Sequence, residues 1–265
     1  MPAPEADLDL LIQAAHTAGE VALRYFKGSA KVWDKADNQG PVSEADLAVN
    51  DHLQGVLAGA RPAYGWMSEE SDPLGDLSRL SAETLFIVDP IDGTRAFLDG
   101  QPGWAHALAV VQGGRPVAGV VHLPALGLTY AARAGGGATL NGTPIAATTR
   151  ADPEGATALT TRAALEPAHW PGGAPGLVRH FRPSLAWRLA LVGEGRFDAM
   201  LTLRDAWDWD IAASALIASE AGALVTDLSG SALSFNSARA RSPGILAAPP
   251  ALHAALRARL APRGA

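Results

Sequence analysis

Apolar side chains recur at helical spacing in two stretches near the start of the chain, separated by a polar connector. Residues 7–27 form the first stretch, and Gly28 behind it is a typical helix stop. The second stretch begins after Ser43, with Asp46 three positions later. This spacing is typical of a helix N-terminus, because the two residues can satisfy each other's main-chain N–H groups. We therefore predict two helices, the second over residues 44–60.

Short apolar runs between glycine- and proline-containing turns fill the middle of the chain, a pattern typical of β-strands. One run leads from Tyr64 into a pair of glutamates. Four apolar residues at 85–88 predict a buried strand, which we expect to end at Asp89 because Pro90 cannot donate a ladder hydrogen bond. Three more strands are predicted at residues 103–111, 117–122 and 128–133, followed by a hairpin-like turn at residues 135–143.

The pattern changes at about residue 145, after which predicted helices and strands alternate. The predicted strands are residues 156–161, 197–203, 223–226 and 245–248, and the predicted helices are residues 185–195, 211–221 and 250–259. Residues 166–178 are rich in proline and glycine and are predicted to be a loop.

Composition narrows the classes of protein to consider. A chain of 265 residues with 48% hydrophobic content can bury a substantial core. Its net charge of −6 argues against nucleic-acid binding as the main role, and no apolar run reaches the roughly 18 residues of a membrane span. The acidic start lacks the basic-then-apolar order of a signal peptide. With no cysteine, disulfides and thiolate chemistry are excluded, and the cytoplasm is the simplest location.

Two aspartates, Asp89 and Asp92, stand three residues apart at the end of the predicted buried strand. Placing both there is unfavourable, because like charges repel and burial penalises each ionised group. A bound divalent cation removes this cost, and hard oxygen donors are the ligands that Mg²⁺ prefers. The alternative is an ordinary Asp-Gly turn with no metal.

Further carboxylates precede two other predicted elements. Glu69 and Glu70 follow a short strand, where paired glutamates are usually a solvated turn. Asp208 and Asp210 stand before a predicted helix, where one carboxylate alone would serve as an N-cap. Loop ends of an α/β scaffold are also where a cation site is assembled. The candidate metal ligands are Glu69, Asp89, Asp92 and Asp210.

Three separated motifs resemble the inositol monophosphatase superfamily, whose members are magnesium-dependent, lithium-sensitive phosphomonoesterases. They are Asp89-Pro90-Ile91-Asp92-Gly93-Thr94, the preceding Ser68-Glu69-Glu70-Ser71 and the later Trp209-Asp210-Ile211-Ala212. Lys35 and the stretch Val42-Ser43-Glu44-Ala45-Asp46 also fit the family pattern, with serine in place of threonine. The similarity spans nearly the whole chain.

The resemblance implies a role for each matched position. Two Mg²⁺ ions would be held by Glu69, Asp89 and the Ile91 carbonyl, and by Asp89, Asp92 and Asp210, with a third, weaker ion through Glu69. Asp210 matches rather than Asp208, because only Asp210 is followed by the family's x-Ala. Thr94, with Glu69 and Asp46, would orient the attacking water, and Lys35 would lie near the metals. The implied substrate contacts are Asp92, Gly93, Thr94, Arg95 and Ser184.

The resemblance also implies a layered α-β-α-β-α fold of mixed α+β and α/β character. Residues 1–144 would form an α+β half with most of the metal ligands, and residues 145–265 an α/β half that contributes Asp210 and substrate contacts. Relatives are commonly homodimers, so a homodimer is expected. The expected partner is a small phosphate ester, with no nucleic acid and no membrane.

The substrate is predicted from departures from the inositol-specific pattern. Arg95 follows the threonine where those members have Asn-Phe, and Leu201–Arg204 lacks the glutamate that contacts the sugar alcohol. Both departures weaken inositol phosphate as the dedicated substrate, and an arginine after the threonine is similar to histidinol phosphatases and to 3′(2′),5′-bisphosphate nucleotidases. The second phosphate of a bisphosphate would need a basic contact, for which the candidates are Arg95, Arg179, Arg182, Arg188 and Arg204. We rank 3′-phosphoadenosine 5′-phosphate first, then inositol 1-phosphate, then histidinol phosphate. A metal-dependent phosphate-binding regulatory module is the non-enzyme alternative; a nucleotide-dependent dehydrogenase would need a glycine fingerprint that is absent.

Overall fold

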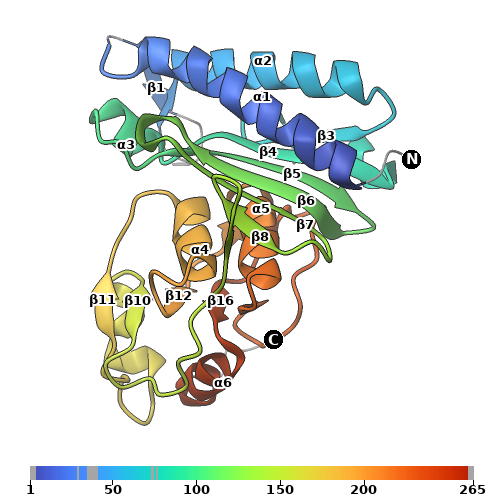
Figure 1. Cartoon of the computed structure of the whole chain (residues 1–265). Coiled ribbons are helices and arrows are strands. Elements are labelled where there is room, and N and C mark those ends of the chain that lie inside the picture. Colours follow the sequence, from blue (N-terminus) through green and yellow to red (C-terminus); the bar gives the residue numbers. More distant parts are fainter. Residues whose placement is uncertain (1–3, 29, 35–40, 73–74, 76, 262–265) are drawn as a thin grey trace.

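Five layers of helix and sheet alternate through the molecule (Figure 1). The computed structural model describes residues 4–28, 30–34, 41–72, 75 and 77–261. The layers contain helices α1 (Pro4–Tyr25) and α2 (Glu44–Ala60), a seven-stranded sheet, helices α4 (Leu185–Gly193) and α5 (Asp208–Glu220), a five-stranded sheet, and helix α6 (Pro250–Arg259). This arrangement confirms the layered α-β-α-β-α fold that the sequence predicts.

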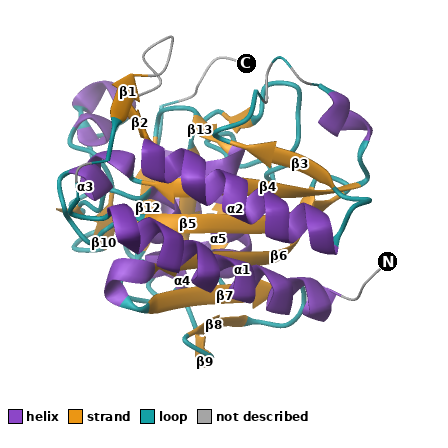
Figure 2. Cartoon of the chain, turned by 90° about the horizontal axis from the view of Figure 1, so that it is seen from above, coloured by secondary structure: helices purple, strands orange, loops and turns teal. Residues whose placement is uncertain are grey.

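The seven-stranded sheet is built from consecutive strands in the order β3-β4-β5-β6-β7-β8-β9. Their bounds are β3 Gly65–Ser68, β4 Thr84–Asp92, β5 Ala105–Gln112, β6 Arg115–Leu123, β7 Leu128–Arg133, β8 Ala138–Leu140 and β9 Thr143–Ile145. Strands β3 and β4 are parallel and all other neighbours are antiparallel. Figure 2 shows α1 and α2 lying across one face of this sheet. Because α5 covers the other face, every residue of β4 is buried.

Strand β4 corrects one prediction, because it does not end at Asp89. It continues to Asp92, and its register against β5 shifts between Asp89 and Asp92. Pro90 lies within this irregularity, where the strand needs no ladder N–H from it. The carbonyl of Pro90 instead accepts a hydrogen bond from Nδ1 of His106 on β5. The irregularity therefore places two aspartates on one short segment without breaking the strand.

The five-stranded sheet has the order β11-β10-β12-β16-β14. Its strands are β10 Thr157–Leu159, β11 Val178–His180, β12 Ala199–Thr202, β14 Leu224–Thr226 and β16 Ile245–Ala248, and two small hairpins pair β1 Val32–Asp34 with β2 Pro41–Ser43 and β13 Ala206–Trp207 with β15 Arg241–Ser242. Four of the five strands lie where the sequence predicts them. Strand β11 is the exception: it begins at the last residue of the predicted loop and forms the sheet edge.

Helix α5 contacts its neighbours through small residues and main chain. Almost all of its side chains are buried, which is typical of a helix enclosed on all sides. Gly119 on β6 faces it so closely that a Cβ there would lie 2.8 Å from the Ala213 carbonyl oxygen. On the α4 side, a Cβ at Gly193 would lie 3.2 Å from Cα of Ala218. The position of α5 is therefore set by backbone contact.

Two helix starts position residues of the site. Helix α2 begins as predicted, with the Ser43 N–H donating to Asp46 Oδ2 at 2.8 Å. Helix α5 begins at Asp208, three residues before the predicted start, so Asp208 and Asp210 both lie in its first turn. No helix among the described residues is long and apolar enough to cross a bilayer. The division into residues 1–144 and 145–265 stays a prediction.

Candidate active site

Carboxylates from three elements converge at one edge of the seven-stranded sheet. Asp89 and Asp92 lie at the end of β4, and Glu69 directly follows the parallel strand β3, so both strands end at the same edge. The Glu69 N–H donates to the Val88 carbonyl at 3.2 Å. Asp210 comes from the first turn of α5. Carboxylate oxygens of Asp89, Asp92 and Asp210 lie within 4.8 Å of one another.

These carboxylates surround a cavity of about 460 Å³, which we call the acidic cavity. All five predicted metal ligands line it, namely Glu69, Asp89, Ile91, Asp92 and Asp210. A second cavity of about 470 Å³, the arginine cavity, contains Arg95 and shares Glu69, Gly93, Thr94, Phe181 and Arg204 with the first. The two cavities therefore form one continuous cleft, with the clustered carboxylates at one end and Arg95 with Asp99 at the other.

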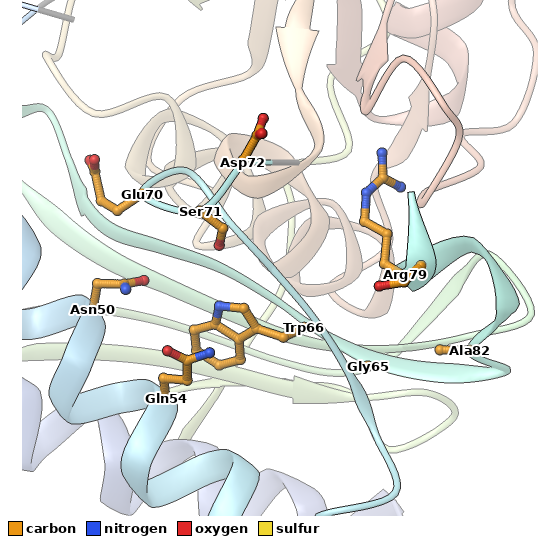
Figure 3. Close-up of a pocket in the computed structure, with 10 residues that line it drawn as sticks. Asn50, Gln54, Gly65, Trp66, Glu70, Ser71, Asp72, Arg79 and Ala82 are labelled. Carbon is orange, nitrogen blue, oxygen red and sulfur yellow. The ribbon is translucent and has the colours of Figure 1, made fainter. Parts of the chain in front are cut away.

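The two adjacent glutamates face different cavities. Glu69 lines both parts of the cleft, whereas Glu70 lines a separate cavity of about 360 Å³ that includes Trp66 and Arg79 (Figure 3). In the same view, Asn50 of α2 faces the segment that carries Glu70. The Ser68 hydroxyl donates to Asn50 Oδ1 at 2.7 Å and fixes the start of this segment. The structure thus distinguishes two glutamates that the sequence places side by side.

Two of the clustered carboxylates, Asp92 and Asp210, have a raised pKa. Burial raises the pKa of Asp210 well above its usual range, and the charges of Asp92 and Glu69 raise it further. Burial also raises the pKa of Asp92, although hydrogen bonds from Ser184 and Ala186 act in the opposite direction. Repulsion of this kind disappears when a cation binds between the groups. The donor set is entirely oxygen, so these residues fit Mg²⁺.

Asp92 is held from the neighbouring layer by the N-terminus of α4. Its Oδ2 accepts hydrogen bonds from the Ser184 hydroxyl at 2.7 Å and from the Ala186 N–H at 2.6 Å. Ser184 also caps α4 by accepting the Trp187 N–H at 2.9 Å, and its side chain is 0% exposed. The hydroxyl group of Ser184 is therefore buried and engaged twice, which supports a role in orienting Asp92, and the substrate contact expected of Ser184 stays a prediction.

Thr94 links the β4 segment to α2. Its hydroxyl oxygen lies 3.2 Å from Asp46 Oδ1 and 3.2 Å from the Ile91 carbonyl oxygen. Gly93 before it has a φ of 97°, a left-handed conformation that favours glycine, and begins the one-turn helix α3 (Thr94–Leu98). The structure thus brings Asp46, Gly93 and Thr94 to the acidic carboxylates. Lys35, predicted to lie near the metals, is outside the described residues.

Sequence reasoning missed two residues of this region. His106 holds the Pro90 carbonyl, and because burial lowers its pKa to about 3, its ring is neutral and Nδ1 donates the proton. Phe181 lines both parts of the cleft. Neither lies in a recognisable motif, so no local pattern marks them. Of five arginines proposed for a second phosphate, Arg95, Arg188 and Arg204 line the cleft, whereas Arg179 and Arg182 do not line either cavity.

Comparisons with known proteins agree with this geometry. The pattern of the inositol monophosphatase family matches residues 4–263. A histidinol-phosphatase of Chlorobaculum parvum is 33% identical over 237 residues, which cover 84% of this chain and 86% of that protein. A 3′(2′),5′-bisphosphate nucleotidase of Aggregatibacter actinomycetemcomitans is 29% identical over 243 residues, 85% and 86% of the two chains. The solved structure of the IMPase of Thermotoga maritima matches with a TM-score of 0.82 at 28% identity, over 96% of both chains.

Proposed function

Because this chain belongs to the inositol monophosphatase family, and is therefore a Mg²⁺-dependent phosphoric monoester hydrolase, we propose that it hydrolyses a small phosphorylated metabolite in the acidic cavity. The observation that carries this proposal is the convergence of Glu69, Asp89, Asp92 and Asp210 on one cavity beside Thr94. We propose 3′-phosphoadenosine 5′-phosphate as the substrate, with inositol 1-phosphate second and histidinol phosphate third.

We assign the metal ligands as the sequence predicts them. Glu69, Asp89 and the Ile91 carbonyl would hold one Mg²⁺, Asp89, Asp92 and Asp210 a second, and Glu69 would contribute to a third, weaker site. Bound Mg²⁺ supplies a Lewis acid that offsets phosphate charge and promotes ionisation of water at neutral pH. Because the oxygen atoms that would bind it come from β4, the segment after β3 and α5, α5 must stay packed against the seven-stranded sheet for the site to form.

The chain's own residues would position the water that attacks phosphorus. Thr94 can donate a hydrogen bond to Asp46, which leaves the lone pairs of its hydroxyl oxygen free to accept a hydrogen bond from water. Asp46 also accepts the Ser43 N–H, so its carboxylate is fixed in place. Glu69 on the opposite side would orient the same water. Attack forms the new P–O bond as the ester P–O bond breaks, and inorganic phosphate and an alcohol are released.

Main-chain amides at the start of α3 would bind the phosphate. The first N–H groups of a helix lack intrahelical partners, and those of Gly93 and Thr94 lie at the junction of the two cavities. Since α3 is a single turn, we attribute this binding to the individual N–H groups rather than to a helix dipole. The φ of 97° at Gly93 is what turns the chain sharply after Asp92.

Removal of the Ser184 hydroxyl tests the support of Asp92. We expect Ser184→Ala to lower kcat/KM by about 10- to 100-fold, the usual cost of losing a partner that orients a metal ligand. The Mg²⁺ concentration for half-maximal activity should rise in parallel. Ser184→Thr, which keeps the hydroxyl, should recover most of the activity. A loss in KM for substrate alone, with an unchanged Mg²⁺ dependence, would instead support the direct substrate contact that the sequence predicts.

The arginines of the arginine cavity support a substrate with a second anionic group. Arg95 and Arg204 line the arginine cavity, and Arg204 also reaches the acidic cavity. Guanidinium groups bind phosphate through paired hydrogen bonds. Leu201–Arg204 carries no carboxylate to bind a sugar alcohol, and Asp205, which follows it and lines the acidic cavity, pairs with Arg241 at 3.4 Å. These features favour a bisphosphate over inositol 1-phosphate.

The substrate proposal is tested by phosphate release from a panel. We expect kcat/KM to be highest for 3′-phosphoadenosine 5′-phosphate, at least about tenfold above inositol 1-phosphate, histidinol phosphate and fructose 1,6-bisphosphate, because one guanidinium–phosphate contact contributes about 1.5 kcal/mol or more. All four should require Mg²⁺. Equal, slow turnover of the four esters would overturn the ranking. Lithium sensitivity and a homodimeric assembly stay predictions from the family resemblance, and a cytoplasmic location stays a prediction from composition.

A further inference from the structure

An aromatic side chain stands where the two parts of the cleft meet. Phe181 directly follows the edge strand β11, and its side chain is 48% exposed. It lines both the acidic and the arginine cavity, together with Thr94 and Arg204. An isolated exposed apolar residue needs no explanation by itself. Its place beside the residues that would bind phosphate is what makes this ring informative.

A buried arginine side chain lies against one face of this ring. The guanidinium carbon of Arg188 lies 4.3 Å from the ring centroid of Phe181. Arg188 is 9% exposed, and it donates from Nε to the Arg182 carbonyl and from Nη2 to the Pro183 carbonyl at 3.1 Å. A cation held against one face draws electron density toward that face. One face of the ring is therefore packed against a cation and polarised by it, while Phe181 stays about half exposed and lines the cleft.

We propose that Phe181 is a stacking platform for a planar heteroaromatic ring of the substrate, and so determines specificity rather than taking part in catalysis. This inference rests on the proposed function, because it places the phosphate of the same ester at Gly93 and Thr94. A purine in a nucleoside bisphosphate and an imidazole in a histidinol ester share the required chemistry. An inositol ring has no π-face and would gain nothing from Phe181. Arg95 and Arg204 would bind the remaining anionic groups.

The test compares two substitutions at one position. Phe181→Leu keeps an apolar side chain but removes the aromatic ring, whereas Phe181→Tyr keeps the ring. We expect Phe181→Leu to raise KM for 3′-phosphoadenosine 5′-phosphate by about 10-fold or more, the usual effect of losing a base–aromatic stack, with kcat little changed. Phe181→Tyr should stay close to the parent protein. Turnover of inositol 1-phosphate should be the same in the parent protein and the two variants. If Phe181→Leu also raises KM for histidinol phosphate, the stacked group includes the imidazole; if it does not, the stacked group is the purine alone.

A matched pair of inhibitors separates this inference from the substrate proposal. Adenosine 5′-phosphate and ribose 5-phosphate differ in the presence of the base, so the ratio of their inhibition constants measures stacking of the base on Phe181. This ratio can be measured with any phosphate ester that the protein hydrolyses. The ratio should favour the nucleotide in the parent protein and fall toward one in Phe181→Leu. An unchanged ratio, or an equal loss of activity on inositol 1-phosphate, overturns the platform. Poor hydrolysis of 3′-phosphoadenosine 5′-phosphate with an intact ratio would instead overturn only the substrate ranking.

Discussion

Glu69→Gln is expected to lower kcat/KM by more than about 100-fold, whereas Glu70→Gln should leave it within about threefold. Glu69 lines the acidic cavity with Asp89, Asp92 and Asp210, and neutralising it removes a carboxylate that would hold the metal and orient water. Glu70 lines the separate cavity beside Trp66. The two substitutions remove the same charge from adjacent positions, so each is the control for the other. Phosphate release at saturating Mg²⁺ measures both.

Two readings of that experiment would contradict the assignment. Equal losses in the two variants would mean that the whole segment after β3 was displaced, which circular dichroism and melting temperature would reveal. A severe loss in Glu70→Gln alone would indicate that the metal binds in the separate cavity beside Trp66 and not in the acidic cavity. Titration with Mg²⁺ adds a second readout, because a lost ligand raises the metal concentration needed for activity even where some turnover survives.

Asp210→Asn is expected to abolish most activity and yet to stabilise the metal-free protein. In the folded chain the pKa of Asp210 is raised by burial and by the charges of Asp92 and Glu69, so its ionised form is unfavourable there. Asparagine carries no charge and removes this repulsion. For a domain of this size, each 1 kcal/mol of stabilisation raises Tm by about 2–4 °C, and we expect a gain of about that size at pH 8. Scanning calorimetry in chelator measures it.

The pH dependence of that gain follows from the sign of the shift. A carboxyl whose pKa is higher in the folded than in the unfolded chain holds its proton longer when folded, so its contribution to stability is lost as pH rises. The Tm difference between Asp210→Asn and the parent protein should therefore be larger at pH 8 than at pH 5. Saturating Mg²⁺ should reverse the order, because only the parent protein retains all the ligands. A variant that is less stable than the metal-free parent at pH 8 would contradict this account.

Much of the site was predictable from sequence because its residues carry local signatures. Asp89 and Asp92 follow a run of buried apolar residues, where two charges without a cation would be unfavourable. Ser43 and Asp46 have the spacing of a helix start, and the structure places Asp46 next to Thr94 as a result. The order of helices and strands was predictable because helical and strand periodicities change at clear turn residues, whereas the layered arrangement was predicted from the family resemblance.

The remaining features depend on contacts between segments far apart in the chain. Ser184 is predicted to contact substrate, but its hydroxyl group is buried and donates to Asp92, which the N-terminus of α4 contacts. Strand β4 extends past Pro90 because His106 satisfies the Pro90 carbonyl from the next strand. Phe181 follows a three-residue edge strand that has no pattern of its own. Periodicity reports which face of an element is buried, and it does not report which partner covers that face.

The contact between Gly119 and Ala213 has a consequence for how this enzyme can diverge. Asp210 lies one turn before Ala213 on α5, so the distance from Asp210 to the β4 aspartates depends on the contact between the backbones of α5 and β6. No side chain lies between these two backbones at Gly119, so none can lengthen or shorten that distance. A methyl group at position 119 would displace α5, and Asp210 with it, away from the sheet. Phe181 and Arg204, in contrast, are exposed residues that line the cleft. New substrates can therefore be acquired by altering one wall of the cleft while the metal spacing stays constant.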